Sequence, residues 1–183
     1  MSPARRRVGA PKPPKTGPSA RGRAPDGPAR RTSPGGGMSL EHAGCVVSTD
    51  AGLLDVDFIC AALAGSYWAR DRPRHVVEQS IRNSLCFGLY EKQGGRQVGF
   101  ARVVTDGATF SWLCDVVIDG SRRGMGLGKF LMSFVVAHPQ VGGTVCLLGT
   151  RDAHGLYEKF GFARSEQMRR PPSPGRPGPP CQA

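Results

Sequence analysis

The stretch from Leu113 to Val136 constrains the fold of this 183-residue chain more than any other. It opens with an apolar run, Leu113 to Ile118, whose length suits a buried strand. A short polar segment then leads into three alternating glycines, Gly124, Gly126 and Gly128. Apolar residues next recur at the spacing of one helix face, at Leu127, Phe130, Leu131, Phe134 and Val135. The stretch therefore predicts a strand, a glycine loop and an amphipathic helix.

The glycine loop suits a bound phosphate. A helix N-terminus exposes unpaired N–H groups and the positive end of the helix dipole, and glycines let an anion approach the backbone. The P-loop pattern fails, because Arg123 stands at its first glycine and Phe130 at its hydroxyl position. The dinucleotide fingerprint fails, because Lys129 stands at its last glycine. Another type of phosphate loop, or a plain glycine-rich turn, remains.

The remaining pattern, Arg123-x-x-Gly126-x-Gly128, resembles the pyrophosphate-binding signature of the GNAT superfamily of N-acetyltransferases. Downstream, the segment LYEKFGF from Leu156 to Phe162 resembles the second signature of that family, a short helix that carries a tyrosine and ends at a glycine. The order of the two signatures and the gap between them also match. The resemblance covers about residues 45–162 and is to the small, single-domain bacterial members.

The resemblance implies that the protein uses acetyl-coenzyme A as a co-substrate. The residues that would hold its pyrophosphate are Arg123, Gly124, Met125, Gly126, Leu127, Gly128 and Lys129. Its pantetheine arm would lie along the backbone of Val116, Val117 and Ile118. Tyr157 stands where the family has the general acid that protonates the departing thiolate, and a packed helix tyrosine is the alternative reading.

The acceptor is expected near Tyr67, Trp68 and Arg72, in the break between the first two predicted helices. The resemblance places acceptor entry in that region. The two aromatic side chains could form a wall and Arg72 a carboxylate anchor, or the aromatics could close the core under a loop. No general base is evident. His154, His75 and Asp115 are candidates, and a base acting through water, or no base, is equally compatible with the family.

Hydrophobic periodicity and turn residues predict a mixed α/β (α+β) fold. The expected strands are 44–48, 85–90, 97–104, 109–118, 144–149 and 162–167, and the expected helices are 54–63, 73–84, 126–138 and 153–159. This order gives a GNAT-like mixed sheet that is mostly antiparallel, with a central βαβ crossover and flanking helices. The resemblance implies that the two strands around the glycine-loop helix are parallel and splay apart.

Composition separates the two ends of the chain from its middle. Residues 1–37 hold nine Lys or Arg, one acid, eight Pro and seven Gly, too little apolar surface to offset chain entropy. We therefore expect a disordered basic tail at 1–37, an N-acetyltransferase domain at 38–168 and a disordered Pro-rich tail at 169–183. The overall net charge of +11 belongs to the tails, since residues 38–168 are formally neutral.

Several function classes are excluded or disfavoured. No stretch reaches the ~18 apolar residues of a membrane span. No Cys/His pair has zinc-ligand spacing, so we expect no metal site. The six cysteines show no C-x-x-C pair, and three of them lie in apolar runs, which predicts reduced thiols and a cytoplasmic protein.

The leading hypothesis is an N-acetyltransferase that moves an acetyl group from acetyl-coenzyme A to a primary amine of a small molecule or protein. Transfer would occur by direct attack in a ternary complex. One alternative is a non-catalytic acetyl-coenzyme A sensor, against which Tyr157 argues. Another is a nucleic-acid binder that uses its basic arm, against which the neutral middle of the chain argues. A homodimer is left open.

Overall fold

The computed structural model describes residues 41–170, and the predictions for the two tails lie mainly outside this range. Five strands form one sheet in sequential order: β1 (Cys45–Ser48), β2 (Leu85–Glu91), β3 (Gln97–Thr105), β4 (Phe110–Ile118) and β5 (Val145–Leu148). Neighbouring strands are antiparallel except β4 and β5, which are parallel and are joined by a helix. The predicted mixed sheet with its central crossover is confirmed.

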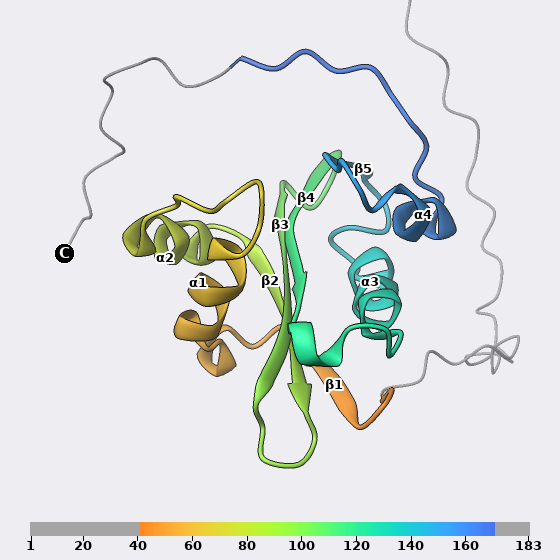
Figure 1. The fold of residues 1–183 in the computed structure, drawn as a ribbon. Coiled ribbons are helices and arrows are strands. Elements are labelled where there is room, and N and C mark those ends of the chain that lie inside the picture. Colours follow the sequence, from red (N-terminus) through yellow and green to blue (C-terminus); the bar gives the residue numbers. More distant parts are fainter. Residues whose placement is uncertain (1–40, 171–183) are drawn as a thin grey trace, which may run out of the picture. The chain divides into compact units, whose positions relative to one another are not determined.

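Helices cover both faces of the sheet (Figure 1). They are α1 (Val56–Ala64) and α2 (Arg74–Arg82) on one side, and α3 (Leu127–Ala137) and α4 (His154–Tyr157) on the other. Short 3-10 turns lie at Ala51–Leu53, Gly120–Arg122 and Glu158–Phe160. Each predicted helix is present, although the last is shorter than expected and continues as a 3-10 turn that ends at Gly161, with φ of 82°.

The core explains why strands such as β2 are apolar without interruption. Phe87 and Leu89 point into the cluster that α3 covers, whereas Cys86 points into the cluster under α1 and α2. A strand covered on both faces has no solvent side, so its sequence loses the polar alternation of a half-exposed strand. The fully buried residues Leu131 and Ile59 contribute the facing helix surfaces.

The parting of β4 from β5 places the candidate site. The parallel pairing runs only from Phe110 to Leu113 on β4, while Cys114 to Ile118 pair with β3 alone. Cys114 and Val117 of β4 pair with Arg102 and Phe100 of β3, so three residue steps on β4 lie opposite two on β3. β4 therefore carries one extra residue at this point, a β-bulge. The splay that the resemblance implied is therefore present, and the edge of β4 from Cys114 to Ile118 has no strand partner on the β5 side among residues 41–170.

The expected last strand at 162–167 is wrong. Residues 162–170 form no regular element, and the outer edge of β5 has no strand partner among residues 41–170. The segment offers few apolar side chains to bury, and Met168 is fully exposed. Because strands are stabilised mainly by packing of side chains on a sheet face, such a segment gains little from pairing.

Two expected absences concern the described residues only. No helix among them is long and apolar enough to cross a membrane. No group of three or more potential metal ligands is found among them either. The cysteines from Cys45 to Cys146 are all free thiols, and burial raises the pKa of Cys86 and Cys114 to about 11.

We propose that residues 38–168 fold without the tails. The buried hydrophobic residues of the described range lie between Cys45 and Val141, so removing residues 1–37 and 171–183 removes none of them. Protein trimmed to residues 38–170 should melt cooperatively, with a Tm within about 3 °C of the full chain. Circular dichroism at increasing temperature checks this. A trimmed protein without a cooperative transition would show that the domain boundaries are wrong.

Candidate active site

The glycine loop takes the conformation that its glycines permit. Gly124 and Gly126 have φ of 80° and 76°, in the left-handed region that side chains disfavour, and α3 begins directly after Gly126. Asp119 holds the start of the loop by accepting hydrogen bonds from the Ser121 amide and hydroxyl. The first amides of α3 have no acceptor within the helix and remain available. The loop therefore has the geometry that suits an anion at a helix start.

The two arginines of the loop differ. Arg122 is paired with Glu91, and Arg96 pairs with the same carboxylate and with Asp119. Arg123 is exposed and has no ion-pair partner among residues 41–170. Of the two, Arg123 is the one whose guanidinium remains available for a phosphate.

His42, which lies just before β1, supports the loop, and no sequence pattern indicated it. Its Nε2 lies 2.9 Å from the carbonyl oxygen of Met125, and its ring packs 5.5 Å from that of Phe130. A Cβ at Gly126 would lie only 2.9 Å from the same Nε2. Gly126 is thus required both by its φ and by the contact with His42. The sequence carries no signal for this contact, because the partners lie more than 80 residues apart.

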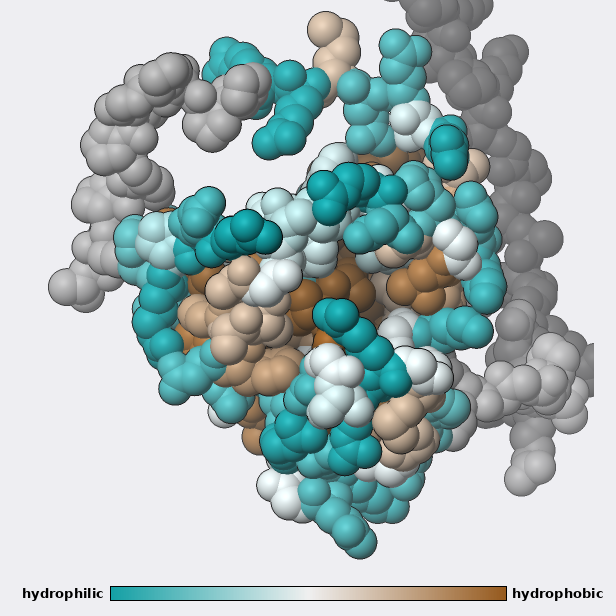
Figure 2. Space-filling view, in the orientation of Figure 1, coloured by the Kyte–Doolittle hydropathy of each residue, from teal (hydrophilic) through white to brown (hydrophobic). Residues whose placement is uncertain are grey.

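The free edge of β4 and the start of α3 meet at one opening. Val116, Val117 and Ile118 are half-buried there, and a Cβ at Gly128 would come within 4.0 Å of Ile118 and 3.9 Å of Leu156. The glycine loop, the β4 edge and the short helix α4 are therefore neighbours. Figure 2 shows apolar residues at the bottom of a recess on this side of the molecule, where β4 lies in Figure 1.

Tyr157, at the end of α4, lies half-buried with its ring 5.9 Å from that of Phe162. Burial raises its pKa to about 12, and Tyr67 and Asp152 add to the effect. Its hydroxyl has no hydrogen-bond partner among the described residues. A phenol that keeps its proton and lacks an acceptor can donate to a bound group.

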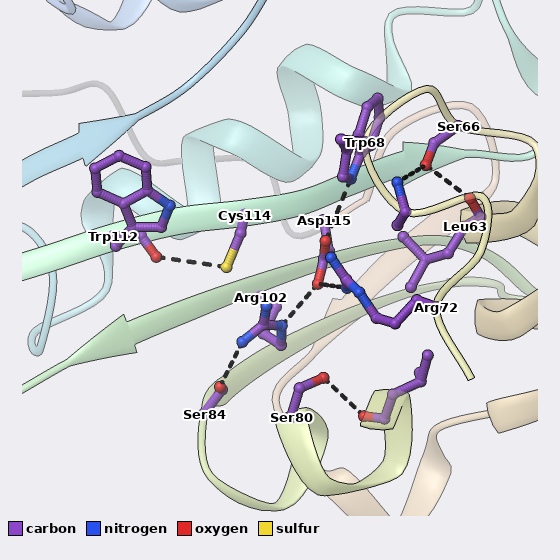
Figure 3. A network of polar contacts seen from close by, with 12 residues as sticks. Leu63, Ser66, Trp68, Arg72, Ser80, Ser84, Arg102, Trp112, Cys114 and Asp115 are labelled. Atoms are coloured by element: carbon purple, nitrogen blue, oxygen red, sulfur yellow. Dashed lines mark hydrogen bonds and ion pairs between the residues drawn. The ribbon is translucent and has the colours of Figure 1, made fainter. Parts of the chain in front are cut away.

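Asp115 organises the other side of the opening (Figure 3). It lies in the β4 bulge with φ of 55°, and its carboxylate is buried. Its Oδ2 accepts hydrogen bonds from Arg72 and Arg102, each at 2.8 Å, and its Oδ1 accepts one from the Trp68 indole at 3.2 Å. Arg102 also donates to Ser84. One carboxylate therefore joins the α1–α2 loop to β3 and β4.

This network changes two of the expectations. Burial alone would raise the pKa of Asp115, but Arg102 and Arg72 lower it by more, so the carboxylate is a poor general base. Arg72 is engaged by Asp115, which argues against its expected role as a carboxylate anchor. The structure supports a positioning role for Asp115 and Arg72, whose ion pair holds the α1–α2 loop against β4.

Tyr67 and Trp68 form an exposed aromatic pair next to Tyr157. Their rings meet edge to face at 4.9 Å, and 40% of Tyr67 and 44% of Trp68 remain exposed. Neither closes the core, so the alternative reading of buried aromatics is not supported. The Tyr67 hydroxyl accepts a hydrogen bond from the Arg151 amide at 2.9 Å. This bond joins the α1–α2 loop to the loop after β5.

The remaining candidate bases lie apart from one another. His75 is exposed near the start of α2. His154 opens α4 and lines, with Tyr157, a cavity of about 780 Å³ along the outer edge of β5. Neither the glycine loop nor the β4 edge borders this cavity, so it is not the expected cofactor site. The splay and the glycine loop, rather than this cavity, define the candidate active site.

Comparisons with known proteins agree with this geometry. Residues 82–164 match the family described as the acetyltransferase (GNAT) domain. A solved structure from Xanthomonas campestris is 43% identical in sequence. Its description assigns that protein to the GNAT family of acetyltransferases. The match covers 71% of this chain and 94% of that one, with a TM-score of 0.67.

Two curated relatives match a shorter part of their own length. A Gibberella zeae protein, whose name assigns it as an acetyltransferase by inference, is 37% identical over 108 residues. The match covers 49% of this chain and 61% of that protein. The Arabidopsis thaliana GCN5-related N-acetyltransferase 1, chloroplastic, is 30% identical over 126 residues, covering 67% and 64%. The Xanthomonas campestris match is 43% identical and covers 94% of that protein's chain. The present chain therefore belongs to the GNAT family of N-acetyltransferases.

Proposed function

We propose that the protein transfers the acetyl group of acetyl-coenzyme A to a primary amine of a small molecule or peptide, by direct attack in a ternary complex. One observation carries the proposal. The free edge of β4 and the glycine loop are neighbours of α4, which carries Tyr157, and Tyr157 is close enough to Tyr67 of the exposed aromatic pair to be affected electrostatically. A loop suited to an anion, an unpaired strand edge and a phenol that keeps its proton therefore lie in one region, which supports the proposal.

The residues present fit acetyl-coenzyme A. The free Arg123 guanidinium and the first amides of α3 would hold the pyrophosphate, with Gly124 to Lys129 contributing backbone. The unpaired edge from Val116 to Ile118 would hydrogen-bond the pantetheine arm. When bound, acetyl-coenzyme A supplies the activated acetyl group.

Tyr157 acts as a hydrogen-bond donor to the departing sulfur. An ordinary thiol has a pKa of about 8.5, whereas that of Tyr157 is raised to about 12. Complete proton transfer from Tyr157 to a thiolate is therefore uphill, but a hydrogen bond from its hydroxyl stabilises the developing charge. The amine has no evident protein base, so it attacks as the free base, and the rate rises with pH as the amine deprotonates.

The test is acetyl transfer itself. The full chain is incubated with radiolabelled acetyl-coenzyme A and a panel of primary amines that includes polyamines, amino acids and short peptides. We expect acetylated product from at least one amine and equal release of coenzyme A. Tight binding of acetyl-coenzyme A without transfer to any member would favour the sensor alternative.

The glycine loop gives a sharper test of cofactor binding. Gly126→Ala places a side chain at a left-handed φ and against His42, so the loop must shift. Acetyl-coenzyme A affinity should fall at least about tenfold, an effect of about 1.4 kcal/mol. Isothermal titration calorimetry measures this, with Gly143→Ala, in open space after α3, as the matched control. Unchanged affinity in a folded Gly126→Ala protein would remove the loop from the site.

A further inference from the structure

Arg151 lies on the acceptor side of the candidate site and has no role in the proposed function. It lies in the loop after β5 and is exposed, and its guanidinium has no carboxylate partner among residues 41–170. The carboxylate next to it in sequence, Asp152, forms no ion pair with it either. The guanidinium therefore keeps its capacity to donate hydrogen bonds.

The position of Arg151 is fixed by two contacts with one residue. Its guanidinium lies over the Tyr67 ring, with its central carbon 3.8 Å from the ring centroid, and its amide donates to the Tyr67 hydroxyl. Stacking leaves the in-plane N–H groups of a guanidinium free, and those groups match a carboxylate or phosphate in two parallel hydrogen bonds. Tyr67 thus holds Arg151 ready for an anion.

Tyr67 also connects Arg151 to the reacting region. Tyr67 packs on Trp68, which is held by the buried Asp115, and Tyr67 is close enough to Tyr157 to influence it electrostatically. Arg72, a cation of the α1–α2 loop that carries Tyr67, is engaged by Asp115. Arg151 is therefore a cation that Tyr67 holds in place and that can receive a negatively charged group.

We infer that Arg151, stacked on Tyr67, anchors an anionic group of the acceptor, so that the preferred substrates are amines that also carry a carboxylate or a phosphate. This inference rests on the proposed function and narrows its substrate class. The anchor fixes one end of the acceptor at the loop after β5 while its amine extends toward the opening of the β4–β5 splay. Holding both ends in line supplies part of the rate.

The experiment compares matched amines with and without the anion. One arm pairs β-alanine with β-alaninamide, and the other pairs O-phosphoethanolamine with ethanolamine, which separates carboxylate from phosphate. We expect the wild-type kcat/KM to favour the anionic member in one arm. In Arg151→Gln that preference should fall by about tenfold, mainly through KM, since a charge-assisted hydrogen bond is lost. Comparing wild type and variant cancels the different basicities of the amines.

Two controls isolate the anchor. Arg70→Gln removes the same charge from an exposed position on the Tyr67 loop and should leave the preference unchanged. Arg151→Lys keeps the charge but not the flat stacking, and should retain only part of it. No preference in the wild type, an equal loss in Arg70→Gln, or a preference for amines without an anion would overturn the inference.

A binding measurement separates this inference from the proposed function. The chain has two tryptophans, so Trp112→Phe leaves Trp68, beside Tyr67, as the fluorescent reporter. With coenzyme A present, the anionic amines should change its fluorescence, and Arg151→Gln should weaken their binding. Anion binding without acetyl transfer would refute the proposed function but keep the anchor. Acetyl transfer with Arg151-independent binding would keep the function and refute the anchor.

Discussion

Replacing Tyr157 by phenylalanine should lower kcat by roughly 100-fold, while acetyl-coenzyme A affinity stays nearly unchanged. The change removes one oxygen and keeps the ring that packs on Phe162, so the fold should survive. The hydroxyl has no hydrogen-bond partner among residues 41–170, so its loss leaves no partner unsatisfied. An equal loss in kcat and kcat/KM marks an interaction made only in the transition state. Steady-state kinetics with calorimetry of cofactor binding provides the measurement.

The pH profile of the same variant follows from the raised pKa of Tyr157. Because that pKa is about 12, the phenol stays protonated throughout the usual range, and the wild-type rate should rise to pH 10 without falling. Tyr157→Phe should show the same rise at a lower level. A falling limb near pH 10 in the wild type that vanishes in the variant would mean that the tyrosine ionises at its ordinary pKa.

Tyr90→Phe is the matched control. The Tyr90 hydroxyl is buried and has no hydrogen-bond partner in the described part of the chain, and burial raises its pKa to about 12, but it lies in β2 and not at the glycine loop or on α4. Its removal should leave kcat unchanged. If both variants lose activity equally, the effect comes from packing. A wild-type kcat in Tyr157→Phe would reduce Tyr157 to a packed helix residue.

The fold was largely predictable because its signals are local. Apolar runs, the helix spacing after Gly126 and the turns at Gly94–Gly95 and Asp106–Gly107 each depend on a few neighbouring residues. The last strand could not be judged in this way. Whether residues 162–167 pair depends on what they could bury against the edge of β5, which no local pattern encodes.

The residues of the candidate site likewise differ in whether a local sequence pattern indicates them. The glycine loop and Tyr157 belong to contiguous motifs, so the sequence located them, and their roles stay predictions. The contacts of His42 and Arg151 join segments more than 80 residues apart, and no local sequence pattern indicates them. The expected role of Arg72 stays a prediction, and the contact that argues against it is also distant in sequence. Its partner Asp115 lies 43 residues away, in a bulge that brings the carboxylate under the α1–α2 loop.

Replacing Asp115 by asparagine should lower the free energy of unfolding by about 3 kcal/mol, because it removes the charge of that carboxylate. Asparagine has nearly the same shape and also tolerates the left-handed φ of this position, so the change removes charge without adding backbone strain. It leaves Arg102, 12% exposed, and Arg72, 23% exposed, without their counter-ion. Urea unfolding at pH 7 measures the free energy.

The pH dependence tests whether the charge is the cause. The two arginines hold the pKa of Asp115 below its ordinary value of about 3.9 in the folded state, so its contribution is complete above that value. It is lost as pH falls through the lower folded-state pKa. The difference in unfolding free energy between wild type and Asp115→Asn should therefore be constant from pH 5 to 8 and shrink below about pH 4.

Asp57→Asn separates this effect from the loss of any carboxylate, since Asp57 is 82% exposed and pairs with Arg74 on the surface. It should leave stability nearly unchanged, because exposed ion pairs gain little over hydration. Asp115→Asn should in addition raise KM for the acceptor, since Trp68 and Arg72 lose the group that holds their loop. A fully stable Asp115→Asn protein with wild-type KM would show that Asp115 neither stabilises the fold nor positions the acceptor loop.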